Sequence, residues 1–345
     1  MNQPSSVACG AVVTQPQLDD AVHQLQLEAL GQGMIPIAAI LSRRLRDGRH
    51  KVLGAGWNHL AEGIPGIHGE TGAIINLGRR PEGYADLVAT SSLSPCPFCQ
   101  CTMVRHLGIR EVRILDDLNY RPDKRSYAGL GAHVESLSHK GIERTFKAWL
   151  GTMSHRVLWE RDIGQFSGPV APPFPITNHR RRLQQVLVLA QAKAAAAGAR
   201  GEAPIGAVVL DAQGEVIGCA GSEIACHNDP SRVAAMAAWR ACGARDHWMD
   251  KTLVLTTGPD AIAFSMFKIF NFGQLVVASD KVFAGHLSAV RALNRDPDRT
   301  HQISVKVLHD PTADQLLTAW IGHNSPVVVR EYLGIEWRAG ERVAR

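Results

Sequence analysis

Three residues with donor atoms that zinc prefers stand in the first half of the sequence. His68 is followed two residues later by Glu70, and a Pro-Cys-x-x-Cys segment then supplies Cys96 and Cys99. One imidazole and two thiolates are three tetrahedral ligands, and they leave the fourth position open to water, whose pKa zinc lowers from about 15.7 to about 7. Glu70 is close enough to His68 to carry protons between that water and a substrate. The spacing predicts a catalytic zinc site.

A structural zinc site is the alternative interpretation of these residues. Structural sites close with a fourth protein ligand, and Cys101 is the nearest further thiol. Residues two apart on a helix do not face each other, so we expect Cys101 to be a buried thiol and not a ligand of the metal that Cys99 binds. A closed site would also have no use for Glu70. An open, catalytic site is therefore favoured.

The composition limits the other classes of function. The chain has 345 residues, 45% of them apolar, which is enough for two domains that each bury a core. A net charge of +5 is too small to argue for a nucleic-acid-binding protein. Seven cysteines, an odd number, suggest no disulfide framework. The first residues do not resemble a signal peptide and no apolar run approaches membrane-spanning length, so we expect a cytoplasmic protein.

A proline-rich segment divides the sequence. Residues 168–177 hold four prolines and are expected to form an extended linker. The predicted domains are therefore 1–167 and 178–345. Three segments of the first half recur in the second at an offset of 164–168 residues: those that begin at Pro36, Val52 and Leu93 recur at Pro204, Val216 and Thr257. Two such copies indicate a duplication.

Strands and helices alternate along each half, which predicts an α/β sandwich with a mixed sheet. In the first half the strands are expected near 35–42, 51–57, 86–92 and 111–116, with a short further strand at 133–137, and the helices near 17–31, 69–78 and 97–107. His68 and Cys96 would then each begin a helix. The partial positive charge of two helix N-termini would favour thiolate at the metal.

The C-terminal copy lacks the metal-binding residues. By local pattern, Val233 and Ala235 stand where the first half has its histidine and glutamate, and Asp260 and Ala263 replace the two cysteines. No other set of zinc ligands is apparent there. We expect one zinc ion per chain, in the N-terminal half, and a degenerate, metal-free C-terminal half.

The first half, from about Ile35 to Gly164, resembles the fungal-type cytosine deaminases of the cytidine deaminase-like superfamily. The His-x-Glu and Pro-Cys-x-x-Cys pattern is the general signature of zinc-dependent base deaminases. The finer resemblance is carried by His68-Gly69-Glu70, Leu93-Ser94-Pro95-Cys96, Gly54-Ala55-Gly56-Trp57-Asn58, Leu118-Asn119-Tyr120 and Trp159-Glu160-Arg161-Asp162-Ile163-Gly164. It implies two tandem three-layer α/β/α domains. The C-terminal half is more similar to the guanine and tRNA-adenosine deaminase branch.

The resemblance also implies the roles of individual residues. Asn58 would hold the base, which agrees with an amide's ability both to donate and to accept hydrogen bonds. Asp162 would accept the exocyclic amine, and Tyr120 and Trp159 would present flat surfaces to the ring. The backbone N–H groups of Gly69 and Cys96 would hold the carbonyl side.

The expected function is that of a zinc-dependent hydrolytic deaminase of a free nucleobase, with conversion of cytosine to uracil and ammonia as the leading reaction. One alternative is deamination of another heterocycle (guanine, isocytosine or a triazine) or of adenosine in tRNA. A further alternative is a non-catalytic, zinc-stabilised binding module. The expected partner is a small heterocyclic base and not a membrane or nucleic acid. The two halves would form an intrachain pseudo-dimer, and pairing into a further homodimer is left open.

Overall fold

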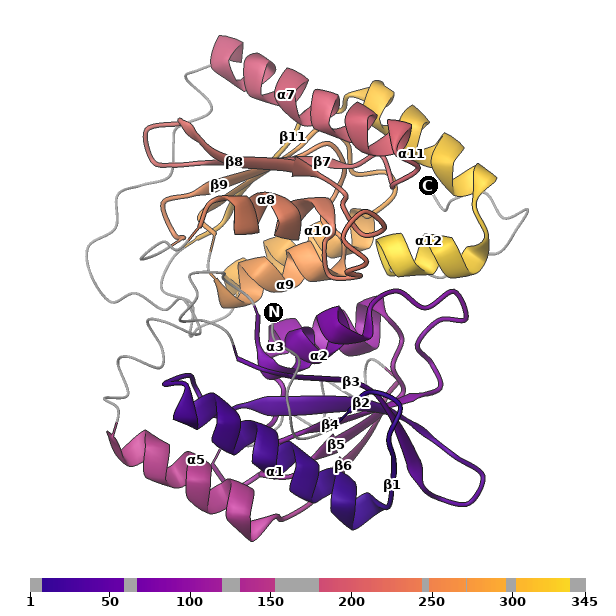
Figure 1. The fold of residues 1–345 in the computed structure, drawn as a ribbon. Helices are drawn as coiled ribbons and strands as arrows, with labels where there is room; N and C mark the ends of the chain where they lie inside the picture. The colour runs from indigo at the N-terminus through magenta and orange to yellow at the C-terminus, as the bar shows by residue number, and fades with distance from the viewer. Residues whose placement is uncertain are drawn as a thin grey trace. The chain divides into compact units, whose positions relative to one another are not determined.

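The computed structural model describes residues 8–58, 67–119, 131–152, 180–243, 248–270, 272–295 and 302–335. The chain divides into two compact units, Met1–Leu158 with Asn228–Ser231, and Trp159–His227 with Arg232–Arg345 (Figure 1). The predicted linker at 168–177 lies outside the described residues, and the predicted domain boundaries stay a prediction. Within the described ranges, no helix has the length and apolar character to cross a membrane.

The first unit is built on a six-stranded mixed sheet with the strand order β1-β3-β2-β4-β5-β6. Strand β2 is antiparallel to both β3 and β4, whereas β4, β5 and β6 are parallel to one another. The elements are β1 (Val12–Val13), α1 (Gln15–Gly31), β2 (Ala38–Arg44), β3 (His50–Trp57), α2 (Gly69–Leu77), β4 (Leu87–Ser91), α3 (Pro97–Gln100), a π-helix (Cys101–His106), β5 (Glu111–Ile114), β6 (His133–Ser136) and α5 (Lys140–Thr152).

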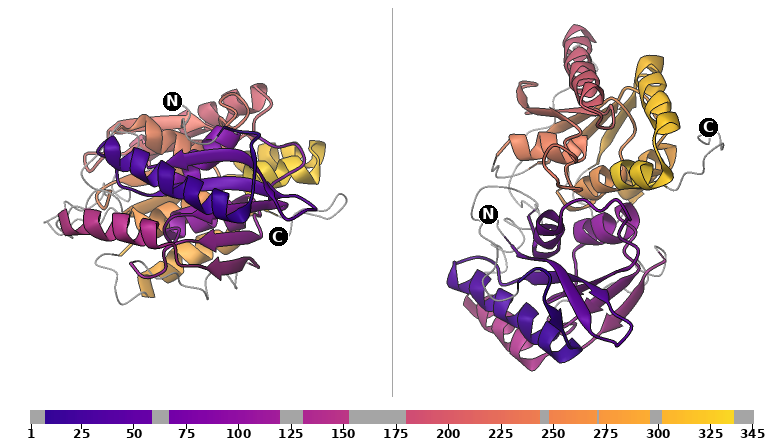
Figure 2. Two further views of the ribbon diagram at one scale, coloured as in Figure 1. Left: turned by 60° about the horizontal axis from the view of Figure 1, so that its bottom comes forward. Right: turned by 45° about the vertical axis from the view of Figure 1, so that its right-hand side comes forward.

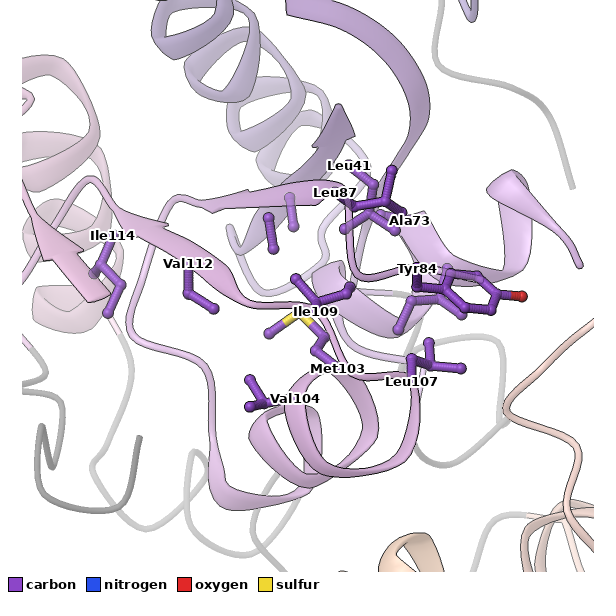
Figure 3. Packing of buried hydrophobic residues seen from close by; sticks show 13 residues of the cluster. Leu41, Ala73, Tyr84, Leu87, Met103, Val104, Leu107, Ile109, Val112 and Ile114 are labelled. Carbon is purple, nitrogen blue, oxygen red and sulfur yellow. The ribbon is translucent and has the colours of Figure 1, made fainter. Parts of the chain in front are cut away.

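Helices cover both faces of this sheet because its central strands are apolar on both sides. On β2, Ala38 and Ile40 pack with α1, while Ala39 and Leu41 face the other way. Helices α1 and α5 lie together on one face, and α2 and the π-helix lie on the other (Figures 1 and 2). Figure 3 shows the core on the side of α2, in which Met103 packs among strand and loop residues. The unit therefore has three layers, α/β/α.

The second unit has a five-stranded mixed sheet with the order β11-β10-β9-β7-β8. Helix α7 covers one face, and α8 and α9 lie on the other (Figure 1). Its elements are α7 (Arg180–Ala199), β7 (Gly206–Leu210), β8 (Val216–Gly221), α8 (Ala234–Ala241), β9 (Thr252–Leu255), α9 (Ala261–Ile269), β10 (Gln274–Val277), α10 (Ala284–Ala292), a 3-10 turn (Leu293–Arg295), β11 (Ser304–Val307), α11 (Pro311–His323) and α12 (Pro326–Leu333). The predicted α/β class with mixed sheets is confirmed.

The two sheets repeat each other in detail. The order β3-β2-β4-β5-β6 corresponds to β8-β7-β9-β10-β11, with the same parallel and antiparallel pairs. A register shift lies between Leu41 and Ser42 on β2 and between Val209 and Leu210 on β7, 168 residues apart, as the sequence offset predicts. The internal repeat seen in the sequence is thus present in the fold.

One difference between the repeats lies directly after the cysteines. The segment from Cys96 to Glu111 in the first unit is one residue longer than the matching segment from Asp260 to Gln274 in the second unit. In the second unit this path is the α-helix α9, whereas in the first it is the short α3 followed by a π-helix. A π-helix has a wider turn that takes up an inserted residue. The helix predicted at 97–107 is therefore in the right place, with a π-helix in its later part.

Candidate metal centre

Two helix N-termini place the candidate metal ligands. His68 is the N-terminal cap of α2 and Cys96 that of α3, both with extended backbone, and Cys99 lies one turn into α3. The His68 N–H donates to Thr71 Oγ1 over 2.8 Å, which fixes the start of α2. Pro97 occupies the first helical position, where its fixed φ favours the helix and its missing N–H costs nothing.

The three side chains converge on one point. His68 Nδ1 lies 3.3 Å from Cys96 Sγ and 3.4 Å from Cys99 Sγ, and the two sulfur atoms are 3.6 Å apart. Zinc with ligands at about 2.0–2.3 Å in a tetrahedron requires separations of roughly 3.5–3.8 Å. The observed separations are close to these values but slightly shorter, so a zinc ion would fit with small movements of the side chains. Among the described residues no other group of three histidine, cysteine, aspartate or glutamate side chains lies this close, and Cys101 is not part of it.

Charge in the site favours one thiolate before any metal is considered. Burial opposes ionisation of Cys96, but hydrogen bonding from the Cys99 thiol and the nearby His68 ring lower the pKa of Cys96 well below its usual value. Burial, the ionised Cys96 and the Glu70 carboxylate raise the pKa of Cys99 well above its usual value. Two buried thiolates side by side repel each other, so full ionisation of the pair needs a cation.

Glu70 is buried next to this donor set. Its side chain is only 2% exposed, and its Oε1 accepts a hydrogen bond of 2.8 Å from Ser91 Oγ on β4. Burial first, and then the charge of Cys96, raise the pKa of Glu70. A raised pKa makes the carboxylate a stronger base than an exposed glutamate, which suits general acid–base catalysis. Glu70 therefore lies beside the donor set, and its role as proton carrier stays a prediction.

Asn58 lies at the end of β3, fully buried, against the start of α2. Its Oδ1 accepts the Gly69 N–H over 2.7 Å, and its Nδ2 has no hydrogen-bond partner among the described residues. A Cβ on Gly69 would lie 2.9 Å from Ala38 Cα, so a glycine is needed for α2 to begin this close to β2. Because the Gly69 N–H is engaged by Asn58, its predicted contact with a substrate stays a prediction.

The predicted contact of the Cys96 N–H with a substrate also stays a prediction, and three further predicted substrate contacts fall outside the described residues. These are Tyr120, Trp159 and Asp162, and their roles stay predictions. The chain leading to Tyr120 is described as far as Asn119, where Asp116 accepts hydrogen bonds from the backbone N–H groups of Leu118 and Asn119.

The second unit has the same helix starts without the donor atoms. Val233 caps α8 where His68 caps α2, and Asp260 caps α9 where Cys96 caps α3. The Asp260 side chain accepts the Ala263 N–H over 2.8 Å. Ser222 is the counterpart of Asn58, since its N–H donates to Ile205 O as that of Asn58 donates to Ile37 O. The residues that replace the ligands are therefore those predicted.

Sequence reasoning missed Ser91 and the pairing of Ser222 with Asn58. A serine inside a predicted strand belongs to no motif, and only the hydrogen bond to Glu70 reveals it.

Comparisons with known proteins give structural similarity only. No protein-family model and no curated protein matches the sequence. Among solved structures, a tRNA:A34 deaminase shares 24% identity, over 39% of this chain and 99% of that one, with a TM-score of 0.35. Guanine deaminase from Nitrosomonas europaea shares 19%, over 45% and 88% of the two chains, with a TM-score of 0.32. The dCMP deaminase of cyanophage S-TIM5 shares 20%, over 36% and 100%, with a TM-score of 0.26. TM-scores below 0.5 do not establish what this chain does.

Proposed function

We propose that the first unit is a zinc-dependent hydrolytic deaminase of a small heterocyclic base. The observation that carries the proposal is a buried carboxyl group, Glu70, next to three side chains whose donor atoms have the geometry of a zinc site with one position left for water. A structural zinc site requires no such carboxyl group. Zinc, when bound by His68 Nδ1 and the sulfur atoms of Cys96 and Cys99, would supply activated water.

Glu70 moves the protons of the reaction. Its carboxylate takes one proton from the attacking water and gives it to the ring nitrogen. It then takes the second proton from the hydroxyl group added to the ring carbon and gives it to the leaving amine, so that ammonia departs as a neutral molecule. Burial at 2% exposure keeps bulk water from exchanging with these protons. The carboxyl group is returned to its starting state after each turnover.

Asn58 orients the base. Its buried Nδ2, which has no partner in the described part of the chain, is a donor suited to the carbonyl oxygen of a pyrimidine. Cytosine, whose carbonyl carbon and amine-bearing carbon flank the same ring nitrogen, offers such an oxygen and is the proposed substrate. Asp162, Trp159 and Tyr120 would complete the pocket, as the resemblance to cytosine deaminases implies.

The test is ammonia release by the zinc-loaded protein. The panel contains cytosine, isocytosine, guanine, adenine, dCMP, a triazine and a tRNA anticodon stem-loop. Cytosine is expected to turn over fastest. Glu70→Gln, which keeps the shape of the side chain, should lower kcat by about 10²–10⁴-fold with unchanged zinc content, and Glu28→Gln on α1 serves as the control.

Two results would count against the proposal. A Glu70→Gln protein with the rate of the wild type would remove the assigned proton carrier. No ammonia from any compound, with one zinc per chain measured in the same sample, would favour a zinc-stabilised binding module. Turnover of guanine or of the stem-loop in place of cytosine would keep the reaction and change the substrate.

A further inference from the structure

We propose that Ser91 is a positioning residue for Glu70: its hydroxyl group fixes one oxygen of the carboxylate so that the other carries the proton. This inference rests on the proposed function, because it assigns a partner to the group that is proposed to move protons. It adds a residue that belongs to neither zinc motif.

Ser91 is held firmly at the centre of the sheet. It is the last residue of β4 and is fully buried, and its backbone pairs with Ala39 on β2 and with Ile114 on β5. Glu70, in contrast, comes from the first turn of α2 and has several rotatable bonds. A hydrogen bond of 2.8 Å from Ser91 Oγ to Glu70 Oε1 therefore joins a long, rotatable side chain to a rigid strand.

The chemistry needs such an anchor. A proton carrier works only when its reacting oxygen stays within hydrogen-bond reach of both water and substrate. A serine hydroxyl donates one hydrogen, and in this geometry it goes to Oε1 and not to Oε2. An alanine at this position would fill almost the same space but would remove the link between the carboxylate and β4.

The second unit provides an internal comparison. The residue that matches Ser91 is Leu255, because Ser91 pairs with Ala39 as Leu255 pairs with Ala207, the counterpart of Ala39. In that unit Ala235 stands in place of Glu70. The hydroxyl group is thus absent from the repeat that lacks the carboxylate.

The next residue along the strand behaves differently. Ser92 Oγ accepts the Ala38 N–H over 2.9 Å, and its counterpart Thr256 accepts the Gly206 N–H over 3.0 Å. That hydroxyl group supports the backbone and is present in both units. The fold itself therefore requires a hydroxyl at position 92 and not at position 91, which points to a role for Ser91 tied to Glu70.

The experiment compares Ser91→Ala with Thr90→Val in the zinc-loaded full-length protein. Thr90 is the neighbouring buried residue on β4, and its hydroxyl has no hydrogen-bond partner among the described residues. Ser91→Ala is expected to lower kcat by tenfold or more, with KM changed less than about twofold and zinc content unchanged. Thr90→Val should stay within about twofold of the wild type, and Ser91→Thr should recover part of kcat.

Another readout does not depend on turnover. The shift in urea midpoint caused by Ser91→Ala is measured in the wild type and in a Glu70→Ala background, as a double-mutant cycle. The shift should be clearly smaller once Glu70 is absent. Equal shifts in both backgrounds, an unchanged kcat, or a loss of zinc that accounts for the loss of kcat would each overturn the role of Ser91. Silence of the wild type towards every substrate would instead overturn the proposed function, and the cycle would still decide whether Ser91 acts on Glu70.

Discussion

Two buried cysteines, two residues apart, illustrate how position on a helix selects a ligand. Cys99 Sγ lies in the donor group, whereas Cys101 begins the π-helix and is not part of that group. Since the two side chains point in different directions, they cannot replace each other at one metal. The spacing in the sequence alone predicts the same distinction.

We expect Cys99→Ser to lose zinc and Cys101→Ser to keep it. The binding free energy of a structural zinc ion is about 10–16 kcal/mol and is shared among a few protein ligands. The loss of one ligand should therefore weaken zinc binding by roughly two orders of magnitude or more. The measurement is metal content by mass spectrometry after dialysis, with one zinc per chain in the wild type. Retention of zinc by Cys99→Ser, or two zinc ions in the wild type, would contradict the assigned set.

How far a residue could be assigned from the sequence depends on where its partner lies. Short local patterns contain His68, Glu70, Cys96 and Cys99, so their types and spacing were sufficient to select them as candidate site residues. The Ser91–Glu70 pair joins a strand to a helix across 21 residues, and no local pattern encodes that contact. Such pairs become visible only when the register between elements is known.

At the level of elements, both units have a glycine at the same position of the strand, Gly54 and Gly218, and the reason is steric. A Cβ on Gly54 would lie 2.4 Å from Ala73 O of α2, and one on Gly218 would lie 2.4 Å from Ala238 O of α8. In both units the strand and the helix that begins at the site touch backbone to backbone. The glycine is therefore required for the close packing of strand and helix, and in the first unit this packing positions α2 and with it His68.

Gly54→Ala should be destabilising, and Gly151→Ala should not. Overpacking usually costs about 1–3 kcal/mol, and here the obstacle is backbone of α2, which also carries His68 and Glu70. We therefore expect a lower urea midpoint together with weaker zinc binding. Gly151 lies in α5 with open space around it, so alanine there should be neutral or stabilising by up to about 1 kcal/mol. Equal midpoints for the two variants would refute the steric explanation.

The elements themselves were largely predictable, since strand alternation and helix caps are local features. Strands β2 to β6 and helices α1 and α2 lie where the sequence predicts them. The π-helix was not predictable, because the extra residue appears only when the registers of β5 and β10 are compared. Helix α5 was also missed, although Ile142, Phe146 and Trp149 form a buried stripe at helical spacing.

At the level of the whole molecule, the same framework has been kept with and without metal ligands. The second unit retains the strand order, the register shift and the two capped helices, but aliphatic and small side chains occupy most ligand positions. Asp260 is the exception, since it stands in place of Cys96 and is a buried carboxyl group that accepts the Ala263 N–H. The second unit thus has a titratable group in an apolar setting.

Asp260 gives the stability of the second unit a dependence on pH. Burial raises the pKa of Asp260 to about 6, against an unfolded value of 3.8, although backbone N–H groups at the start of α9 partly oppose the shift. The folded state therefore binds the proton more tightly. The contribution of Asp260 to the free energy of unfolding is therefore most favourable below about pH 4 and becomes less favourable as the pH rises towards 6. The difference of about two pKa units corresponds to roughly 3 kcal/mol.

The substitution Asp260→Asn should remove the dependence of stability on pH that Asp260 causes. The asparagine keeps a side-chain oxygen that can accept the Ala263 N–H. The variant is expected to be more stable than the wild type at pH 8, by up to about 3 kcal/mol, and about equally stable near pH 4. Urea unfolding at several pH values, followed by the fluorescence of Trp239 and Trp248 in the aromatic cluster of the second unit, measures the difference. A gap of the same size at every pH would show that Asp260 acts as a helix cap alone, and a gap that opens between pH 4 and 6 would show that burial of its charge dominates.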